Sequence, residues 1–184
     1  IKLLNSGGSS KTDFFVILET HKGNFVETFS AKITNEKKKR VSCHEYDYTR
    51  FVDVLDCKNT KLETYLKLFQ EYGGVRKLEE NLDESKSLDE FQQLLSPKKG
   101  ILNEWALSGK HDFNNTFNET QISKNLIIKQ DTLTCMTVED YIKQAEIISH
   151  SNSSNLGTIF TWTYPSGGIG RKIQLKMPIF TQDM

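Results

Sequence analysis

The segment Thr60–Tyr72, TKLETYLKLFQEY, decides the fold class because it reads as a helix in the middle of the chain. Thr60 and Glu63 form a capping box, in which each side chain accepts a hydrogen bond from the other residue's backbone N–H. Apolar residues follow at helical spacing, and Gly73 provides a left-handed stop. These apolar residues are Leu62, Tyr65, Leu66, Phe69 and Tyr72. The pattern predicts a helix over 60–72.

Further helical patterns surround this segment. A second capping box at Ser87–Glu90 opens a short apolar-faced helix that Pro97 ends. Val75–Leu82 and Ile101–Leu107 carry weaker helical patterns. Thr137–Asp140 begins a last helix, whose inner face is Val138, Tyr141, Ile142, Ala145 and Ile148. The middle of the chain is therefore predicted to be largely helical.

Strand patterns lie on the N-terminal side of the helices. Asp13–Thr20 and Phe25–Ile33 are rich in β-branched and aromatic residues, and His21–Asn24 supplies a glycine-containing turn between them. Tyr48–Asp56 is predicted to be a further strand, and Leu126–Lys129 a short one.

A second hairpin pattern, Gly157–Tyr164 with Ile169–Met177, closes the sequence. Strands, then helices, then strands favour the α+β class. We expect an N-terminal β-hairpin plus strand, a helical middle and a C-terminal β-hairpin, with an antiparallel sheet packed on helices. Residues 1–12 read as a flexible tail or linker, and 13–180 as a single domain. Because the sequence begins with Ile, we expect a fragment of a larger protein.

Composition limits the partners and the compartment. Lys plus Arg and Asp plus Glu number 24 each, so any polyanion must be held by a local patch. Three cysteines without regular spacing argue for a reducing, intracellular compartment, cytoplasmic or nuclear. Sequons at Asn114, Asn118 and Asn152 are weighed against this. No apolar run approaches the roughly 18 residues of a membrane span, so no membrane partner is expected.

The sharpest catalytic candidate is Asp56-Cys57-Lys58. An acid and a lysine separated by one residue at a strand end lie on one side of the backbone, where the carboxylate can hold a cation. With Asp47 or Glu45 as a second acid, this resembles the later half of the PD-(D/E)xK nuclease signature. The resemblance implies a nuclease or phosphodiesterase dependent on Mg or Mn. The competing interpretation is that Asp56 and Lys58 are solvated residues.

The aromatic segment before the last turn is a second candidate. Phe160, Trp162 and Tyr164 alternate with threonine, so their rings share one face of a strand. Facing outward beside Arg171 and Lys172, they could stack bases and neutralise phosphates. Facing inward, they are core, and the threonines on the opposite face favour that orientation.

Charge runs and glycines supply weaker candidates. The basic run Lys37–Arg40 could contact phosphates or an acidic partner. Gly167–Gly170 is explained by a hairpin turn, because it lacks the ending of a phosphate loop. Cys43-His44 has no zinc-ligand spacing, so no metal site is expected from it.

Good folding signals without a catalytic set favour a non-catalytic interaction domain of a larger intracellular protein over an enzyme. It would bind a protein or nucleic-acid partner and need no cofactor. The oligomeric state is not predicted. The candidate binding residues are Lys37, Lys38, Lys39, Arg40, Trp162, Tyr164, Arg171 and Lys172. The alternative is the metal-dependent nuclease, with a degenerate PD-(D/E)xK-like site at Asp47, Asp56 and Lys58.

Overall fold

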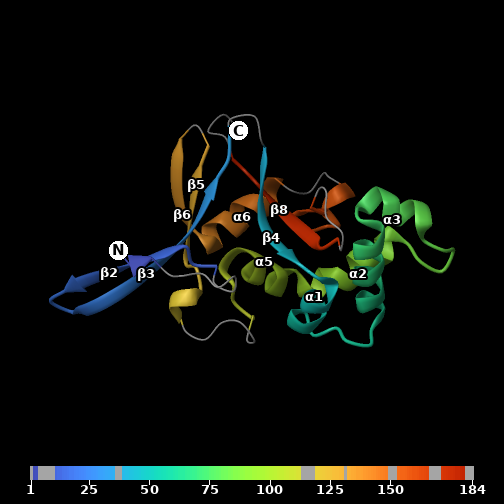
Figure 1. The fold of residues 1–184 in the computed structure, drawn as a ribbon, viewed down its shortest axis with the longest axis horizontal. Helices are drawn as coiled ribbons and strands as arrows, with labels where there is room; N and C mark the ends of the chain where they lie inside the picture. The colour runs from blue at the N-terminus through green and yellow to red at the C-terminus, as the bar shows by residue number, and fades with distance from the viewer. Residues whose placement is uncertain are drawn as a thin grey trace.

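The computed structural model describes residues 2–3, 11–35, 39–112, 119–130, 132–148, 153–165 and 171–180. These parts of the chain form two sheets and a set of helices. The β2–β3 hairpin projects at one end of the molecule, and helices α2 and α3 lie at the other (Figure 1). The α+β prediction is confirmed.

The first sheet has five strands in the order β1 (Lys2–Leu3), β2 (Phe14–Thr20), β3 (Gly23–Ile33), β5 (Asn125–Lys129) and β6 (Leu133–Thr137). All its pairs are antiparallel except β3 with β5, which are parallel. The predicted hairpin and the strand near Leu126 are confirmed. Strand β6, which pairs with the adjacent β5, was not predicted. The parallel pairing of β3 with β5 was not predicted either, because nothing local in a sequence encodes a partner some ninety residues away.

The turn of the β2–β3 hairpin fixes its register. Thr20 pairs with Gly23, so His21 and Lys22 form a two-residue loop. The Thr20 hydroxyl donates to the Gly23 carbonyl at 3.0 Å and accepts from the Lys22 N–H at 3.1 Å. Gly23 has φ +121°, a conformation that residues with a Cβ rarely adopt. The two strands keep this register along the hairpin as far as the pair formed by Phe14 and Phe29.

The second sheet contains β4 (Arg40–Tyr46), β8 (Ile173–Pro178) and β7 (Thr161–Thr163), in that order and antiparallel. Pairing of β7 with β8 confirms the predicted closing hairpin, with shorter strands than expected. The register of β4 against β8 shifts between Ser42 and His44. The glycine-rich segment 167–170 lies outside the described residues.

Six α-helices complete the described part of the chain. They are α1 (Tyr48–Val54), α2 (Lys61–Tyr72), α3 (Val75–Asn81), α4 (Leu88–Leu95), α5 (Lys99–Ser108) and α6 (Val138–Ile148). Both predicted capping residues act as expected: the Thr60 hydroxyl accepts from the Glu63 N–H and the Ser87 hydroxyl from the Glu90 N–H. Among the helices described, each is too short or too polar to cross a bilayer.

The predicted strand Tyr48–Asp56 is wrong, because this segment forms α1. Its apolar residues also fit a helical period, and that pattern prevails. Phe51, Val52 and Leu55 are almost completely buried on one helix face. The strand of this region is β4, which ends one residue before Asp47.

The predicted boundary of the domain also differs from the structure. Lys2–Leu3 pairs with β2, and the Lys11 N–H donates to the Gln121 carbonyl at 3.3 Å. Part of the expected tail is therefore packed on the fold. The sequons at Asn114, Asn118 and Asn152 lie outside the described residues.

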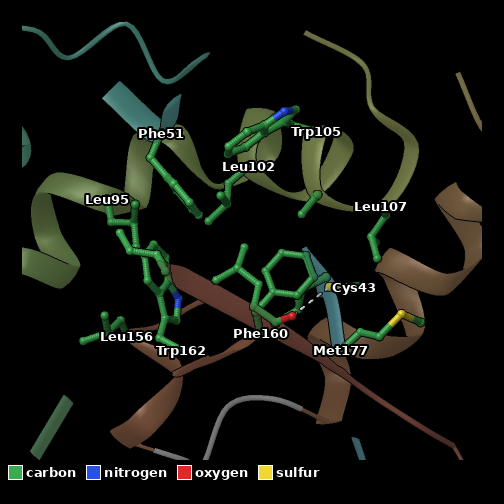
Figure 2. Close-up of a cluster of buried hydrophobic side chains, with 14 of the residues drawn as sticks. Cys43, Phe51, Leu95, Leu102, Trp105, Leu107, Leu156, Phe160, Trp162 and Met177 are labelled. Atoms are coloured by element: carbon green, nitrogen blue, oxygen red, sulfur yellow. Dashed lines mark hydrogen bonds between the residues drawn. The ribbon is translucent and has the colours of Figure 1, made fainter. Parts of the chain in front are cut away.

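The core lies between the helices and the second sheet (Figure 2). Trp162 comes from β7 and is 2% exposed, with Phe51, Phe69 and Phe91 packed around its ring. Its indole N–H donates to the Thr158 hydroxyl at 3.0 Å. The aromatic segment is therefore core, as the alternating threonines favour.

Replacing Trp162 with Ala should lower the free energy of unfolding by about 3–5 kcal/mol, because truncation leaves a cavity among three rings. Phe25→Ala is the matched control, since Phe25 is 50% exposed, and it should cost about 0.5 kcal/mol or less. Denaturant titrations of both variants measure the difference. Equal costs would show that Trp162 does not support the core.

Candidate active site at the open end of the hairpin

Asp13 stands at the open end of the β2–β3 hairpin, one residue before β2. Its N–H donates to the Phe29 carbonyl at 2.8 Å, and its carboxylate Oδ2 accepts from the Ala31 N–H at 2.6 Å. The side chain is thus fixed on the end of β3, although Asp13 is exposed. A charge-assisted bond of this kind orients the carboxylate and leaves oxygen lone pairs for a ligand.

Ser30 and Lys32 flank Ala31 on β3 and share one strand face, because side chains alternate. Ser30 is buried, and its hydroxyl has no hydrogen-bond partner within the described parts of the chain. Asp13 bonds through its N–H to the Phe29 carbonyl and through its carboxylate to the Ala31 N–H, so it is held at the residues on either side of Ser30. The structure therefore assembles an acid and a Ser-x-Lys sequence on adjacent antiparallel strands.

Lys11 is the second lysine of this site. Its ammonium Nζ donates to the Cys43 carbonyl of β4 at 2.5 Å. Desolvation by burial, together with the positive charge of Lys32, lowers the pKa of Lys11 to about 8, while Cys43 and Asp13 act in the opposite direction. Lys11, Asp13 and Lys32 therefore share one electrostatic environment.

A groove of about 410 Å³ begins at Lys11 and runs along β4. Its lining consists of Lys11, Ser42, Cys43, His44, Glu45, Tyr46 and Lys172. Glu45 accepts a hydrogen bond from Gln174 at 3.2 Å, so part of the acidic lining is already engaged. The groove is open to a substrate and joins both sheets at the Lys11–Cys43 bond.

His44 is a buried, neutral member of the groove wall. Its ring centroid lies 4.0 Å from that of Trp105 and 4.8 Å from that of Tyr46. Desolvation by burial, then the charges of Lys11, Lys32 and Arg50, hold the pKa of His44 well below its ordinary value. Neither ring nitrogen has a hydrogen-bond partner in the described ranges.

Behind the histidine, Arg50 forms an ion pair with Asp112, which is 3% exposed. The indole N–H of Trp105 also donates to Asp112, at 3.2 Å. Removing one partner of a buried ion pair leaves an uncompensated charge. This pair therefore fixes Trp105, against which His44 packs.

The chemistry of Asp13 and Ser30 fits a small divalent cation. Within the described residues, no group of three or more His, Cys, Asp or Glu side chains could hold a metal. Mg²⁺ needs no such cage, since it commonly uses one or two carboxylates, water and substrate phosphates. The Asp13 carboxylate and the unpartnered Ser30 hydroxyl supply hard oxygen donors.

The structure does not gather the predicted acids and lysine as the sequence suggested. Asp47 precedes α1 and Asp56 follows it, so a helix of seven residues, about 10 Å long, separates them. Asp56 and Lys58 are both exposed in the turn before α2. The expected strand end that would align these two side chains is absent from this segment.

The predicted binding residues near the C-terminus divide between core and surface. Trp162 is inside the core, so its ring offers no stacking surface. Arg171 donates to the Tyr72 carbonyl at 3.3 Å, and its guanidinium carbon lies 5.2 Å from the Tyr164 ring centroid. Lys172 is exposed and lines the groove.

The basic run 37–40 is only partly described. Lys37 and Lys38 lie outside the described residues, and Lys39 is exposed. Arg40 donates to Asn155 at 3.1 Å. The three cysteines are free, and burial raises the pKa of the Cys43 and Cys57 thiols to about 11, so neither is a ready nucleophile.

Sequence reasoning missed Asp13, Ser30, Lys32 and Lys11. The available signal was the hairpin turn: counting outward equally from His21-Lys22 brings Asp13 to the end of β3 that holds Ser30. Lys11 escaped notice because it belongs to the segment 1–12, whose composition predicts a linker. The segment Ser30-Ala31-Lys32 has a serine where an acid-x-lysine signature has an acid, so its similarity to that signature was not apparent.

His44 predicts acid sensitivity. His44 stays neutral in the folded state, whereas in the unfolded state it can take up a proton. Above the ordinary histidine pKa of 6.5 both states are neutral, so this difference does not affect the free energy of unfolding. Below that pH, stability should fall by up to about 1.4 kcal/mol per pH unit. His44→Leu should flatten this fall, whereas His21→Leu, in the exposed turn, should not. Denaturation curves between about pH 5 and 8 measure it, and equal slopes for the two variants would contradict the assignment.

Comparisons with known proteins place this chain in a family. The family model described as restriction endonuclease MspI matches residues 1–177. The type II restriction enzyme BsuFI of Bacillus subtilis is 32% identical over 178 residues, covering 96% of this chain and 42% of that enzyme. The chain thus spans about two fifths of that relative's length.

A crystal structure of restriction endonuclease MspI in complex with its cognate DNA shares the fold, with a TM-score of 0.78 and 21% identity over 95% of this chain and 68% of that one. The prediction of a non-catalytic interaction domain is wrong, since the matching family consists of nucleases. The findings favour the alternative prediction, a metal-dependent nuclease, over that interpretation. The chain belongs to the family of restriction endonuclease MspI.

Proposed function

We propose that this chain carries the catalytic site of a type II restriction endonuclease, which hydrolyses phosphodiester bonds of DNA with a divalent cation. The observation that carries the proposal is the assembly of Asp13, Ser30 and Lys32 at one hairpin end. Family membership supports it, as does the groove that begins at this site. Because the cysteines are free, an intracellular place of action fits the proposal.

Asp13 is the proposed ligand of the cation, with the Ala31 N–H holding its carboxylate in place. Ser30 would supply a hydroxyl oxygen or bind a water of the cation. When bound, Mg²⁺ neutralises charge on the phosphate and lowers the pKa of a coordinated water. The site thus combines one carboxylate with a hydroxyl in place of a second acid.

Lys32 follows on the same strand face as Ser30, so its ammonium would lie on the side where Asp13 and Ser30 would hold the cation. Its ammonium is proposed to orient the attacking water and to stabilise the negative charge that develops on the phosphoryl oxygens. The water oxygen bonds to phosphorus as the phosphorus–oxygen bond to the leaving group breaks. Electrostatic stabilisation of this step is the main role of the protein's own residues.

DNA is the proposed partner, and the groove along β4 is its proposed place. Lys11 and Lys172 line it. The neighbouring Arg171, and Lys37–Arg40 at the start of β4, remain proposed phosphate contacts. MspI is bound to its cognate DNA in the crystal, which supports a nucleic-acid partner for this chain.

Cleavage assays on variants with normal melting temperatures test the site. Asp13→Asn should abolish Mg²⁺-dependent cleavage of duplex DNA, and Lys32→Met should reduce its rate by about 10²–10⁴. Both residues are at least partly exposed, so neither change should destabilise the fold strongly.

Asp56→Asn and Lys58→Met are the matched controls, since they change the same residue types at the site first suggested by the sequence. They should leave cleavage unchanged. Loss of cleavage in the controls, with full activity in Asp13→Asn, would return the site to Asp56 and Lys58. No cleavage by the unchanged protein with Mg²⁺ or Mn²⁺ would refute the proposed activity.

A further inference from the structure

We propose that Lys11 is a second phosphate-binding lysine, which binds the DNA backbone where the groove along β4 meets the proposed catalytic hairpin. This inference rests on the proposed function and adds a residue to it. Lys11 lies two residues before Asp13 and lines the groove.

The side chain of Lys11 is held along its whole length. Its backbone N–H donates to Gln121, and its ammonium donates to the Cys43 carbonyl at 2.5 Å. The aliphatic part packs over Gly109, where an added Cβ would lie 2.9 Å from Lys11 Cγ. A long side chain fixed in this way loses little further entropy on binding, so its charge is preorganised.

The Lys11 ammonium can donate more hydrogen bonds than the one it makes to Cys43. A lysine ammonium has three donors, and the Cys43 carbonyl takes one. Because Lys11 lines the groove, a ligand lying there can accept from the donors that remain. A phosphate oxygen is the acceptor that matches a positive, multiply donating group.

The charges of Lys11, Lys32 and Asp13 together favour binding of an anion. Lys11 and Lys32 interact unfavourably, and Asp13 is the carboxylate whose charge acts on Lys11. Within the described ranges, neither lysine forms an ion pair with a carboxylate at salt-bridge distance. A bound phosphate would offset the repulsion between the two ammonium groups.

The competing role is purely structural, with Lys11 acting as a tether between the hairpin and β4. Two substitutions separate the roles. Lys11→Gln keeps an amide donor for the Cys43 carbonyl and removes the charge, whereas Lys11→Met removes both. A tether predicts that the Gln variant resembles the unchanged protein. A phosphate contact predicts that it resembles the Met variant.

The measurement is binding of a short mixed-sequence DNA duplex, without divalent metal, over a range of NaCl concentrations. Each lost phosphate contact reduces the slope of log affinity against log salt concentration by about 0.9. Lys11→Gln and Lys11→Met should both show that reduction, with binding about tenfold weaker at low salt. Lys11→Arg should keep the slope. Lys77→Met, at an exposed position of α3, is the matched control and should also keep it.

The outcomes are distinct. A steep slope for the unchanged protein and the same slope for Lys11→Gln would overturn the inference and leave the proposed function standing. Absence of salt-dependent binding by the unchanged protein would remove both. If Lys11→Met lowers the melting temperature, Lys11→Gln with an unaltered melting temperature decides, because it removes the charge from an intact fold and its salt slope then reports the lost phosphate contact alone.

Discussion

The candidate site depends on one hydrogen bond, from the Ala31 N–H to the Asp13 carboxylate at 2.6 Å. Asp13 lies beyond the last regular pair of its hairpin, where a strand end would ordinarily fray. The bond replaces a missing ladder contact with a charge-assisted one, and so fixes the open end of the hairpin. Without it, an exposed aspartate would sample several rotamers, and its alignment with Ser30 and Lys32 would be lost.

A second constraint keeps the site beside a groove. The β2–β3 hairpin belongs to the first sheet and β4 to the second, and the bond from Lys11, just before the hairpin, to Cys43 links the two. Behind β4, the buried Trp105 packs against His44 and bonds to Asp112. The wall of the groove is therefore backed by a packed core. A substrate entering it meets a surface that does not need to reorganise.

Much of the fold could be predicted because its signals are local. The Thr60 and Ser87 caps and the glycine turn at Gly23 act within a few residues, and each functions in the structure as the sequence indicates. Tyr48–Asp56 was misjudged because its apolar spacing fits a helix as well as a strand, and only burial of Phe51 and Leu55 decides. The site escaped prediction because Asp13 comes near Lys32 only when the hairpin folds. In addition, the nuclease signature was sought within one short segment.

The neutral composition is compatible with the proposed DNA partner because charge is segregated over short distances. The chain has equal numbers of acidic and basic residues, so little steering is expected beyond a Debye length of about 8 Å at physiological salt. Close to the groove the balance differs, since Lys11 and Lys172 line it and Glu45, the acid among its described lining residues, already accepts a hydrogen bond from Gln174. Such a local field acts only after encounter, when phosphates are within a few ångströms of the lysines. The protein would then associate with DNA without strong long-range attraction, and its selectivity would come from contacts within the groove instead of from net charge.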